Sequence, residues 1–501
     1  MIGGGIDTGT RIVGPDVDFL AIGPVLALAV AALVVILVRA ILRKRGPVNQ
    51  ISLGVGLAGV AAAGVLLGIQ WNEVRDDGTI TTIAGAVRLD TFGVFLGVVV
   101  LAATAMSLFL AASYLEREEL EAPEYYALML LSAAGMLTMT TANDLIVVFV
   151  ALELLSIPLY VLAAFDRRRL SSQESGIKYF VLGAFSSAVF LYGIALTYGA
   201  TGTTSLTGIA DFLSANTLFE QGTLLAGLAL LLVGLGFKVA AVPFHMWTPD
   251  VYQGAPTPVT AFMSSATKAA GFAALLRLLG VAFPLYRTDW RPAILGLAVL
   301  SLAVGSIAAV IQTDVKRILA YSSIAHAGYI LIGLQVDTAR GRQASLFYLL
   351  VYAFMTVGAF AVITVATRKG DDKHSLDDYR GLALRRPVVG GLLGFFVLAQ
   401  AGVPLTGGFV VKLEIFSSAV DAGEYGLAIV GVLAAVVAAF IYLRIAVALF
   451  TSPGGEAADA SEDRPVDRWT AAVLAVTTAA VLFAGILPGA WLTFAKDATF
   501  L

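Results

Sequence analysis

Four ionisable side chains lie in the middle of long apolar stretches: Glu153, Lys238, Lys268 and Lys412. A charged side chain at the centre of a membrane helix costs about 2.5–3.5 kcal/mol on insertion scales. Such groups are retained where they face a polar interior, pair with one another and take part in moving ions or protons. Proton or ion transfer is therefore the first hypothesis for these four residues.

Glu153 and Lys238 each precede a proline by five positions, Pro158 and Pro243. Proline removes a backbone donor and interrupts a helix, and the freed carbonyl groups need partners such as water or a lysine. Pairing two buried charges costs less than leaving each alone, so we expect Glu153 and Lys238 to meet directly or through water. Two alternatives stay open: a purely structural ion pair, and a lysine that only satisfies the freed carbonyls.

Two further lysines and a histidine extend this set. Lys268 follows three hydroxyl residues that can hold water. Lys412 follows the break at Pro404 in a later interrupted span and mirrors Lys238, which precedes the proline of an earlier one. His326 lies in the segment AYSSIAHAGYILIG, and a histidine can bridge two proton carriers at neutral pH. Lys268 could instead extend its ammonium group to the membrane surface, and His326 could make only a hydrogen bond between helices.

Other polar residues of the apolar spans carry weaker hypotheses. The secondary candidates for the relay, each with an interfacial or structural alternative, are His245, Lys178, Asp144 and Glu414. Packing or interface roles are expected for Arg277, Arg444, Gln400 and Asp314.

The composition of the chain excludes several classes of protein. Its 501 residues are 58% hydrophobic and 13% charged, with a mean hydropathy of +0.88, unlike a soluble domain. The net charge of -3 leaves no basic surface for nucleic acid. With no cysteine and 3 histidines, the chain has no disulfide, thiolate cluster or iron–sulfur ligand set. Electrons, if they are involved, are carried by other proteins.

The hydropathy pattern predicts an all-α polytopic membrane protein, because each crossing needs about 20 apolar residues. About fourteen spans are expected, at 19–40, 51–70, 91–114, 124–141, 143–165, 175–200, 223–253, 256–284, 292–312, 316–336, 342–368, 386–419, 424–451 and 468–494.

Spans seven and twelve are interrupted. Span 223–253 contains Pro243, and span 386–419 contains Pro404 followed by Gly407 and Gly408. Interrupted spans at corresponding places indicate an inverted repeat, and these two lie five spans apart. The predicted division is a three-helix addition at 1–123, repeat one at 124–284, an inverted repeat two at 285–452, and a C-terminal helix at 453–501.

Lysine and arginine cluster in the loops after spans one, five, nine and eleven. These loops share one side if the count of spans is right, and the positive-inside rule makes that side cytoplasmic. Both termini are then expected outside. The segment before the first span lacks the basic start of a signal peptide, so we expect the first span to be retained.

Several segments together resemble the subunit N family of bacterial NADH-quinone oxidoreductase, respiratory complex I, whose mitochondrial counterpart is subunit 2. They are VALELLSIPLYVL, IKYFVLGAFSSAVFLYG, DVKRILAYSSIAHAGYIL and the highly specific FKVAAVPFHMWTPDVYQGAPTPVTAFMSSATKAAGF. The resemblance covers spans four to thirteen. The related subunits L and M and the Mrp-type antiporters read closer to HTWLPDA where this chain reads HMWTPDV.

The resemblance carries functional expectations. It implies that Glu153 and Lys238 form the family's ion pair, that Lys268 is the central lysine and that Lys412 is the exit-side lysine. A polar file Glu153, Lys238, Lys268, His326, Lys412 would then cross the protein in the membrane plane. The resemblance also implies that NADH, FMN, iron–sulfur clusters and quinone are bound by partner subunits.

It implies, further, a place in a bacterial cell membrane among lipid and the partner subunits M, L, K and J. Two alternatives stay open: an Mrp-type monovalent cation/proton antiporter, and a structural membrane subunit without ion translocation.

Overall fold

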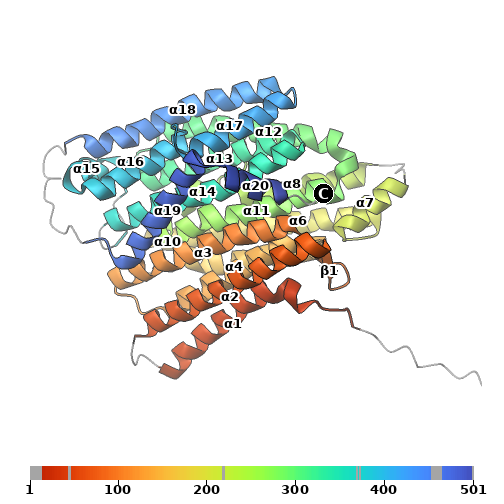
Figure 1. The fold of residues 1–501 in the computed structure, drawn as a ribbon, viewed down its shortest axis with the longest axis horizontal. Helices are drawn as coiled ribbons and strands as arrows, with labels where there is room; N and C mark the ends of the chain where they lie inside the picture. The colour runs from red at the N-terminus through yellow and green to blue at the C-terminus, as the bar shows by residue number, and fades with distance from the viewer. Residues whose placement is uncertain are drawn as a thin grey trace, which may run out of the picture.

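The computed structural model describes residues 14–42, 47–216, 221–367, 370–371, 374–452 and 465–498. Long helices run side by side through the molecule (Figure 1). The elements are α1 (Phe19–Leu42), α2 (Val48–Asp77), β1 (Ile80–Thr82), β2 (Val87–Leu89), α3 (Thr91–Arg117), α4 (Pro123–Thr141), α5 (Leu145–Ala163), α6 (Leu170–Thr201), α7 (Leu206–Ala215), α8 (Gly222–Val239), α9 (Trp247–Gly254), α10 (Thr257–Phe262), η1 (Met263–Thr267), α11 (Lys268–Arg277), η2 (Leu278–Ala282), η3 (Pro284–Tyr286), α12 (Arg287–Val310), α13 (Val315–Gln335), α14 (Ala339–Ala366), η4 (Leu376–Tyr379), α15 (Leu382–Arg385), α16 (Pro387–Ala401), α17 (Gly407–Asp421), α18 (Tyr425–Phe450), α19 (Arg468–Ile486) and α20 (Gly489–Asp497).

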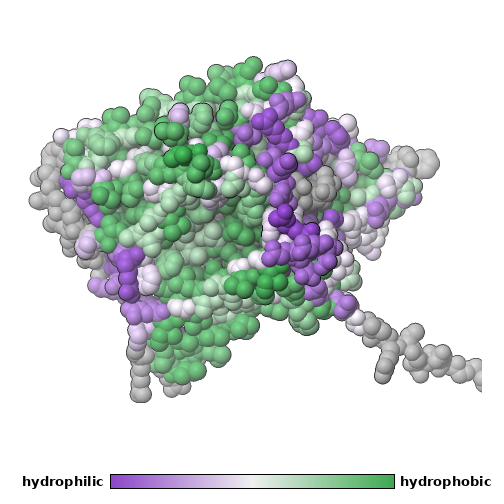
Figure 2. All heavy atoms as spheres, viewed as in Figure 1, coloured by the Kyte–Doolittle hydropathy of each residue, from purple (hydrophilic) through white to green (hydrophobic). Residues whose placement is uncertain are grey.

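The helical membrane fold expected from the sequence is confirmed. Within the described ranges, 12 helical stretches are long and apolar enough to cross a membrane. The other two expected spans correspond to α4 and to the pair α16 and α17, so the count of fourteen stays a prediction. Figure 2 shows a broad hydrophobic surface between two hydrophilic margins, as expected of a protein surrounded by lipid.

Three stretches form the centre of the molecule. Thr257–Ala282 is 100% buried over its most apolar window, and α13 and α14 are 94% buried, whereas α1 is only 22% buried. The N-terminal helix α3 and the C-terminal helix α19 pack against each other and against α14. The candidate residues Lys268 and His326 therefore lie in the stretches most shielded from lipid.

Both expected interruptions coincide with the ends of helices. α8 ends at Val239, Ala240 adopts a left-handed conformation, and helix resumes at Trp247. α16 ends at Ala401 and α17 begins at Gly407. Whether each pair makes one broken membrane span stays a prediction.

A pattern of backbone hydrogen bonds occurs twice with a constant offset. Leu145 N donates to Thr204 O and Leu206 N to Asn143 O, while Val315 N donates to His374 O and Leu376 N to Thr313 O. Each residue of the second set lies 170 positions after its counterpart (315 − 145, 374 − 204).

The same offset relates two close helix contacts. Gly135 lies against the backbone of Leu155, and Gly305 lies against that of Ala325. This agreement supports the proposed repeat, whose boundaries stay a prediction.

Three of the basic loops meet at one end of the bundle. Arg169 and Lys316 both lie within 4 Å of the carboxylate of Asp371, which follows α14. The loops after spans five, nine and eleven therefore share a face, as expected. The basic residues 43–45 of the first loop lie outside the described residues.

Three elements depart from expectation. The C-terminal segment is two helices rather than one, because Pro488 separates α19 from α20. A two-stranded antiparallel hairpin, β1 and β2, and the short helix α7 were not anticipated. The hairpin turn contains Ile83, Ala84 and Gly85 at positive φ.

Candidate functional site

Lys238 lies in the last turn of α8, just before the interruption, and is 4% exposed. Its Nζ donates hydrogen bonds to Ser156 Oγ of α5 at 2.7 Å and to Tyr179 OH of α6 at 3.2 Å. Gly271, one turn beyond Lys268 on α11, packs against the Lys238 side chain. The ammonium group is thus held by hydroxyls from two helices, beside the helix that carries the next lysine.

Glu153 lies on α5 one turn before Ser156. Its Oε1 is buried and has no hydrogen-bond partner among the described residues. In this structure the Lys238 ammonium contacts Ser156 and Tyr179 rather than Glu153. An approach of Glu153 and Lys238 through water stays a prediction.

Lys268 is the first residue of α11 and directly follows the π-helix η1. π-Helical turns are rare and occur often at functional sites. The lysine is 3% exposed, and its Nζ donates to Ser323 O of α13 at 2.5 Å. The ammonium also faces the Tyr352 ring, 5.4 Å from its centroid. Lys268 is therefore fully inside the bundle and does not extend to a membrane surface.

His326 bridges two tyrosines on neighbouring helices. Its Nδ1 lies 2.7 Å from Tyr348 OH of α14, and its Nε2 lies 3.2 Å from Tyr442 OH of α18. The Tyr442 hydroxyl also lies 2.5 Å from Ser322 Oγ, which donates to Gln400 Oε1 at 3.2 Å. Hydroxyls and imidazole can both donate and accept hydrogen bonds, so these groups form a continuous chain from α14 to α16.

Lys412 adjoins the far end of that chain. Its Nζ donates to the backbone oxygens of Gln400 and Ala401, each at 2.8 Å, at the end of α16. It faces the Tyr329 ring, 5.2 Å from its centroid. Lys412 thus occupies freed carbonyls at the interruption, as was considered for Lys238, while its neighbour Gln400 joins the chain to His326.

A second branch joins Lys268 to the same region. Tyr352 OH donates to Ser323 Oγ at 2.9 Å, and the rings of Tyr352 and His326 lie 4.9 Å apart. We give the name central polar network to two hydrogen-bonded sets between Lys268 and Lys412, which meet at the contact of the Tyr352 and His326 rings. One set is Ser323 and Tyr352, the other is Ser322, His326, Tyr348, Gln400 and Tyr442, and all are buried.

The secondary candidates lie outside this network. Lys178 pairs with Glu174 at 2.6 Å and Asp250 at 2.7 Å, Asp144 caps the start of α5, and Glu414 pairs with Arg340 at 3.3 Å. His245 lies between α8 and α9, with an Nδ1 that has no partner among the described residues. Lys178, Asp144 and Glu414 therefore make ion pairs or a helix cap in this structure, and a part of the four residues in the relay stays a prediction.

Several members were not anticipated. Gln400, expected to be a packing group, is part of the network. No role was expected for its members Tyr348, Tyr352 and Tyr442, or for Tyr179, which lies outside it and binds Lys238. Hydroxyls within apolar spans are the signal that could have found them. Arg277 is a packing group as expected: it binds Asp90 through two hydrogen bonds of 2.7 and 2.8 Å, and both side chains are buried.

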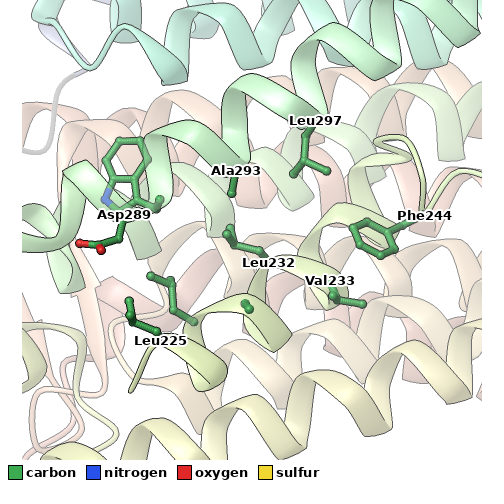
Figure 3. A pocket seen from close by; sticks show the side chains of 10 residues that line it. Leu225, Leu232, Val233, Phe244, Asp289, Ala293 and Leu297 are labelled. Atoms are coloured by element: carbon green, nitrogen blue, oxygen red, sulfur yellow. The ribbon is translucent and has the colours of Figure 1, made fainter. Parts of the chain in front are cut away.

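The cavity between α8 and α12 lies apart from this chemistry (Figure 3). It has a volume of about 390 Å³. Apart from Asp289 its lining is apolar, including Leu232, Phe244 and Leu297, and none of the candidate residues lines it. In the described part of the chain, no group of three or more His, Asp or Glu residues could hold a metal ion.

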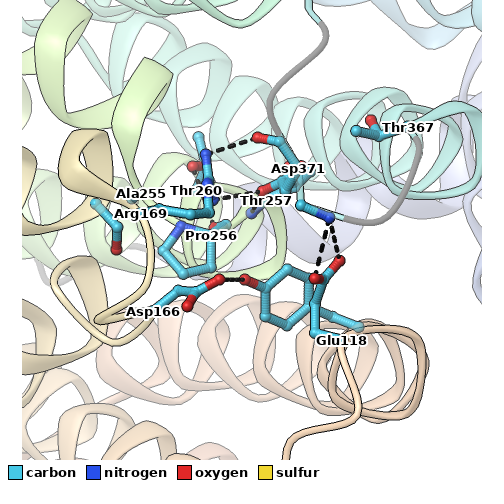
Figure 4. A network of polar contacts seen from close by, with 12 residues as sticks. Glu118, Asp166, Arg169, Ala255, Pro256, Thr257, Thr260, Thr367 and Asp371 are labelled. Carbon is cyan, nitrogen blue, oxygen red and sulfur yellow. Dashed lines mark hydrogen bonds and ion pairs between the residues drawn. The ribbon is translucent and has the colours of Figure 1, made fainter.

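A second buried polar group lies where the basic loops meet (Figure 4). We call it the Asp371 cluster; it comprises Arg169, Thr257, Lys316, Asp371 and His374. Asp371 accepts hydrogen bonds from Thr257 N at 3.0 Å and Thr257 Oγ1 at 2.7 Å, and lies 3.3 Å from Arg169 and 3.2 Å from His374. Burial alone would raise the pKa of Asp371, but Lys316, His374 and Arg169 hold it well below its usual range.

A protein-family model and a related sequence both match this chain. Residues 142–438 match the family described as NADH:quinone oxidoreductase/Mrp antiporter, TM. The chain is 45% identical over 443 residues to the NADH-quinone oxidoreductase subunit N of Trichlorobacter lovleyi, covering 88% of this chain and 89% of the relative.

Solved structures with a similar fold include a chain of a respiratory complex I. A chain of the respiratory complex I of Thermus thermophilus, solved with bound aureothin, aligns with a TM-score of 0.78 and 35% identity, covering 94% of this chain and 99% of that chain. A chain of the Mrp complex from Dietzia sp. DQ12-45-1b aligns with a TM-score of 0.82, over 96% of this chain and 97% of that chain. At 23% identity, that likeness shows the fold alone.

Proposed function

The chain belongs to the subunit N family of NADH-quinone oxidoreductase, a multi-pass membrane subunit of that complex, and from this premise we propose that it moves protons. The relay consists of Glu153, Lys238, Lys268, His326 and Lys412. Proton movement is driven by NADH oxidation and quinone reduction in partner subunits. FMN and the iron–sulfur clusters belong to those partners; with no cysteine, this chain lacks the usual ligands of an iron–sulfur cluster. The expected neighbours are subunits M, L, K and J in a bacterial cell membrane, with both termini outside.

The observation that carries the proposal is the central polar network. It places protonatable groups at hydrogen-bond distance across four helices in the most buried part of the molecule. Buried polar side chains in membrane helices are costly and usually mark a transport pathway. An isolated structural charge would not need a row of hydrogen-bonded side chains such as His326, Tyr442 and Ser322.

The groups have different parts in the transfer. Hydroxyl and imidazole groups pass a proton by donating at one side and accepting at the other. Backbone carbonyls only accept, so those at Ser323, Gln400 and Ala401 hold the lysine ammonium groups in place. Water completes the path between the lysines and the side-chain hydroxyls.

The test uses the assembled complex in sealed membrane vesicles. Lys238→Ala and Lys412→Ala should each lower NADH-driven proton uptake while the amount of assembled complex is retained. NADH oxidation should fall as well, because a coupled pump stalls when one channel is blocked. Lys→Arg should not restore transport, since guanidinium is effectively always charged.

A matched control is Lys496→Ala, which removes an exposed lysine of the same chain. Unchanged rates and an unchanged proton-to-electron ratio in both relay variants would contradict the proposal and favour a structural subunit.

A further inference from the structure

The Asp371 cluster lies outside the proposed relay but contacts the first turns of the helices that carry it. Asp371 is 0% exposed and binds both the N–H and the hydroxyl of Thr257, the first residue of α10. Lys316, in the first turn of α13, lies 3.8 Å from the same carboxylate and donates to Ala255 O at 2.7 Å. One buried carboxylate therefore holds the start of α10 beside the start of α13.

The spacing from these anchors brings Lys268 and Ser323 to the same depth. Lys268 lies eleven residues after Thr257, about 16 Å along the helix, and Ser323 lies seven residues after Lys316, about 10 Å. A lysine side chain leans back towards the N-terminus of its helix. The length of the Lys268 side chain therefore makes up the difference between these two distances. Its Nζ then reaches Ser323 O at 2.5 Å.

This contact depends on the register of the two helices. A slip of one residue moves one helix past the other by about 1.5 Å, enough to break the hydrogen bond. The π-helix η1 lies between Thr257 and Lys268, so regular α-helical geometry does not by itself fix the distance. The anchors at the starts of α10 and α13 limit sliding between the two stretches, and the contact of Lys268 with Ser323 depends on that.

The third helix start at the cluster is that of α6. Arg169, which precedes α6, donates from Nη2 to Asp371 O at 2.6 Å, and its Nη1 lies 3.3 Å from Asp371 Oδ2. α6 carries Tyr179, which accepts a hydrogen bond from Lys238. The cluster thus touches the origins of three helices that contact the relay.

We propose that Asp371 is a positioning residue for proton transfer: it fixes the register of α10–α11 against α13 and so keeps Lys268 at the Ser323 carbonyl. This inference rests on the proposed function, because Asp371 acts only through Lys268. Asp371 is not itself a proton carrier. Its carboxylate is occupied by Thr257 and surrounded by Lys316, Arg169 and His374, and it stays ionised.

The test compares four variants of the complete complex in sealed vesicles: Asp371→Asn, Asp371→Glu, Lys268→Ala and the control Asp377→Asn. Asp377 follows in the same loop, and its side chain is 76% exposed. Assembled complex, NADH oxidation and proton uptake are measured for each. Asp371→Asn should lower proton uptake per assembled complex at least fivefold, as is also expected of Lys268→Ala. Asp371→Glu, which keeps the charge, should restore part of it, and Asp377→Asn should match the wild type.

The outcomes separate the two proposals. If Lys268→Ala is without effect, the proposed function fails. If Lys268→Ala abolishes transport but assembled Asp371→Asn transports normally, or if Asp371→Glu is as defective as Asp371→Asn, the positioning role fails and the function stands.

A milder variant covers failure of assembly. If Asp371→Asn does not assemble, the Thr257→Val variant tests the positioning role instead. This substitution removes only the hydrogen bond from Thr257 Oγ1 to Asp371. Reduced transport in that assembled variant supports the positioning role, and wild-type transport overturns it.

Discussion

The interruption between α16 and α17 offers a sharp test, because Gly408 has no room for a side chain. A Cβ added at Gly408 would overlap the carbonyl oxygen of Ala399 and lie 2.7 Å from its carbonyl carbon. Ordinary contact begins at 3.4 Å, so α17 and the end of α16 must separate by at least 0.7 Å (3.4 − 2.7). Gly408→Ala therefore displaces the two segments that hold Lys412.

The displacement has a predictable effect on the lysine. Lys412 Nζ binds Gln400 O and Ala401 O at 2.8 Å each, and these carbonyls directly follow Ala399. A shift of 0.7 Å stretches those contacts to about 3.5 Å, beyond the usual limit of about 3.2 Å. Overpacking of this kind costs about 1–3 kcal/mol, and a misplacement of about 1 Å can lower a rate by about 100-fold. We expect assembled Gly408→Ala complex to lose at least 90% of its proton uptake, a loss of about tenfold or more and so within that range.

The assay is NADH-driven proton uptake in vesicles, normalised to assembled complex. The matched control is Gly391→Ala on α16, where an added Cβ meets no atom within 4 Å. The control should keep wild-type transport. Wild-type transport by Gly408→Ala would refute the reasoning that Lys412 must be held at the end of α16.

Three further predictions concern other parts of the molecule. Tyr442→Phe removes the hydroxyl between His326 and Ser322 and should slow proton uptake about fivefold, because one hydrogen bond is worth about 1 kcal/mol. The control Tyr425→Phe, at an exposed site of the same helix, should not slow it. Equal rates of proton uptake in Tyr442→Phe and wild type would remove Tyr442 from the path. Arg277→Met leaves the buried carboxylate of Asp90 without its main partner and should destabilise the complex by about 3 kcal/mol, measured as a lower thermal midpoint. The control Arg75→Met breaks an exposed ion pair and should change the thermal midpoint little. The third prediction concerns pH. The folded pKa of Asp371 lies below its unfolded value of about 3.9, so its stabilisation is fully present above that value and lost as pH falls towards the folded pKa. The difference in thermal midpoint between wild type and Asp371→Asn should therefore shrink as pH falls below about 4, and a difference that stays the same down to about pH 2 would contradict it.

The apolar spans and the buried charges could be predicted because both stand out against a hydrophobic background. Lys238, Lys268 and Lys412 are conspicuous for their cost in such a setting, and the structure buries all three. Pro243 and Pro404 mark the interruptions because proline cannot donate to the helix. These are local properties of the chain.

The partners of the lysines could not be predicted in the same way. Tyr179 and Tyr442 are ordinary residues in apolar spans, and only the packing of helices far apart in sequence brings them to Lys238 and His326. Asp371 lies in a charged loop segment that reads as solvent-exposed. Its burial depends on Thr257 and Lys316, more than 50 positions away.

The direction of the central polar network has an electrical consequence. Lys268 lies near the middle of the helical stretch Thr257–Ala282, and His326 and Tyr348 lie within α13 and α14. A charge passed among them therefore travels sideways through the bundle rather than along a helix. Moving one charge across a membrane potential of about 100 mV requires about 2.3 kcal/mol, but movement parallel to the membrane plane requires almost none. The work of pumping against the potential would then be confined to the short segments that join the network to each surface.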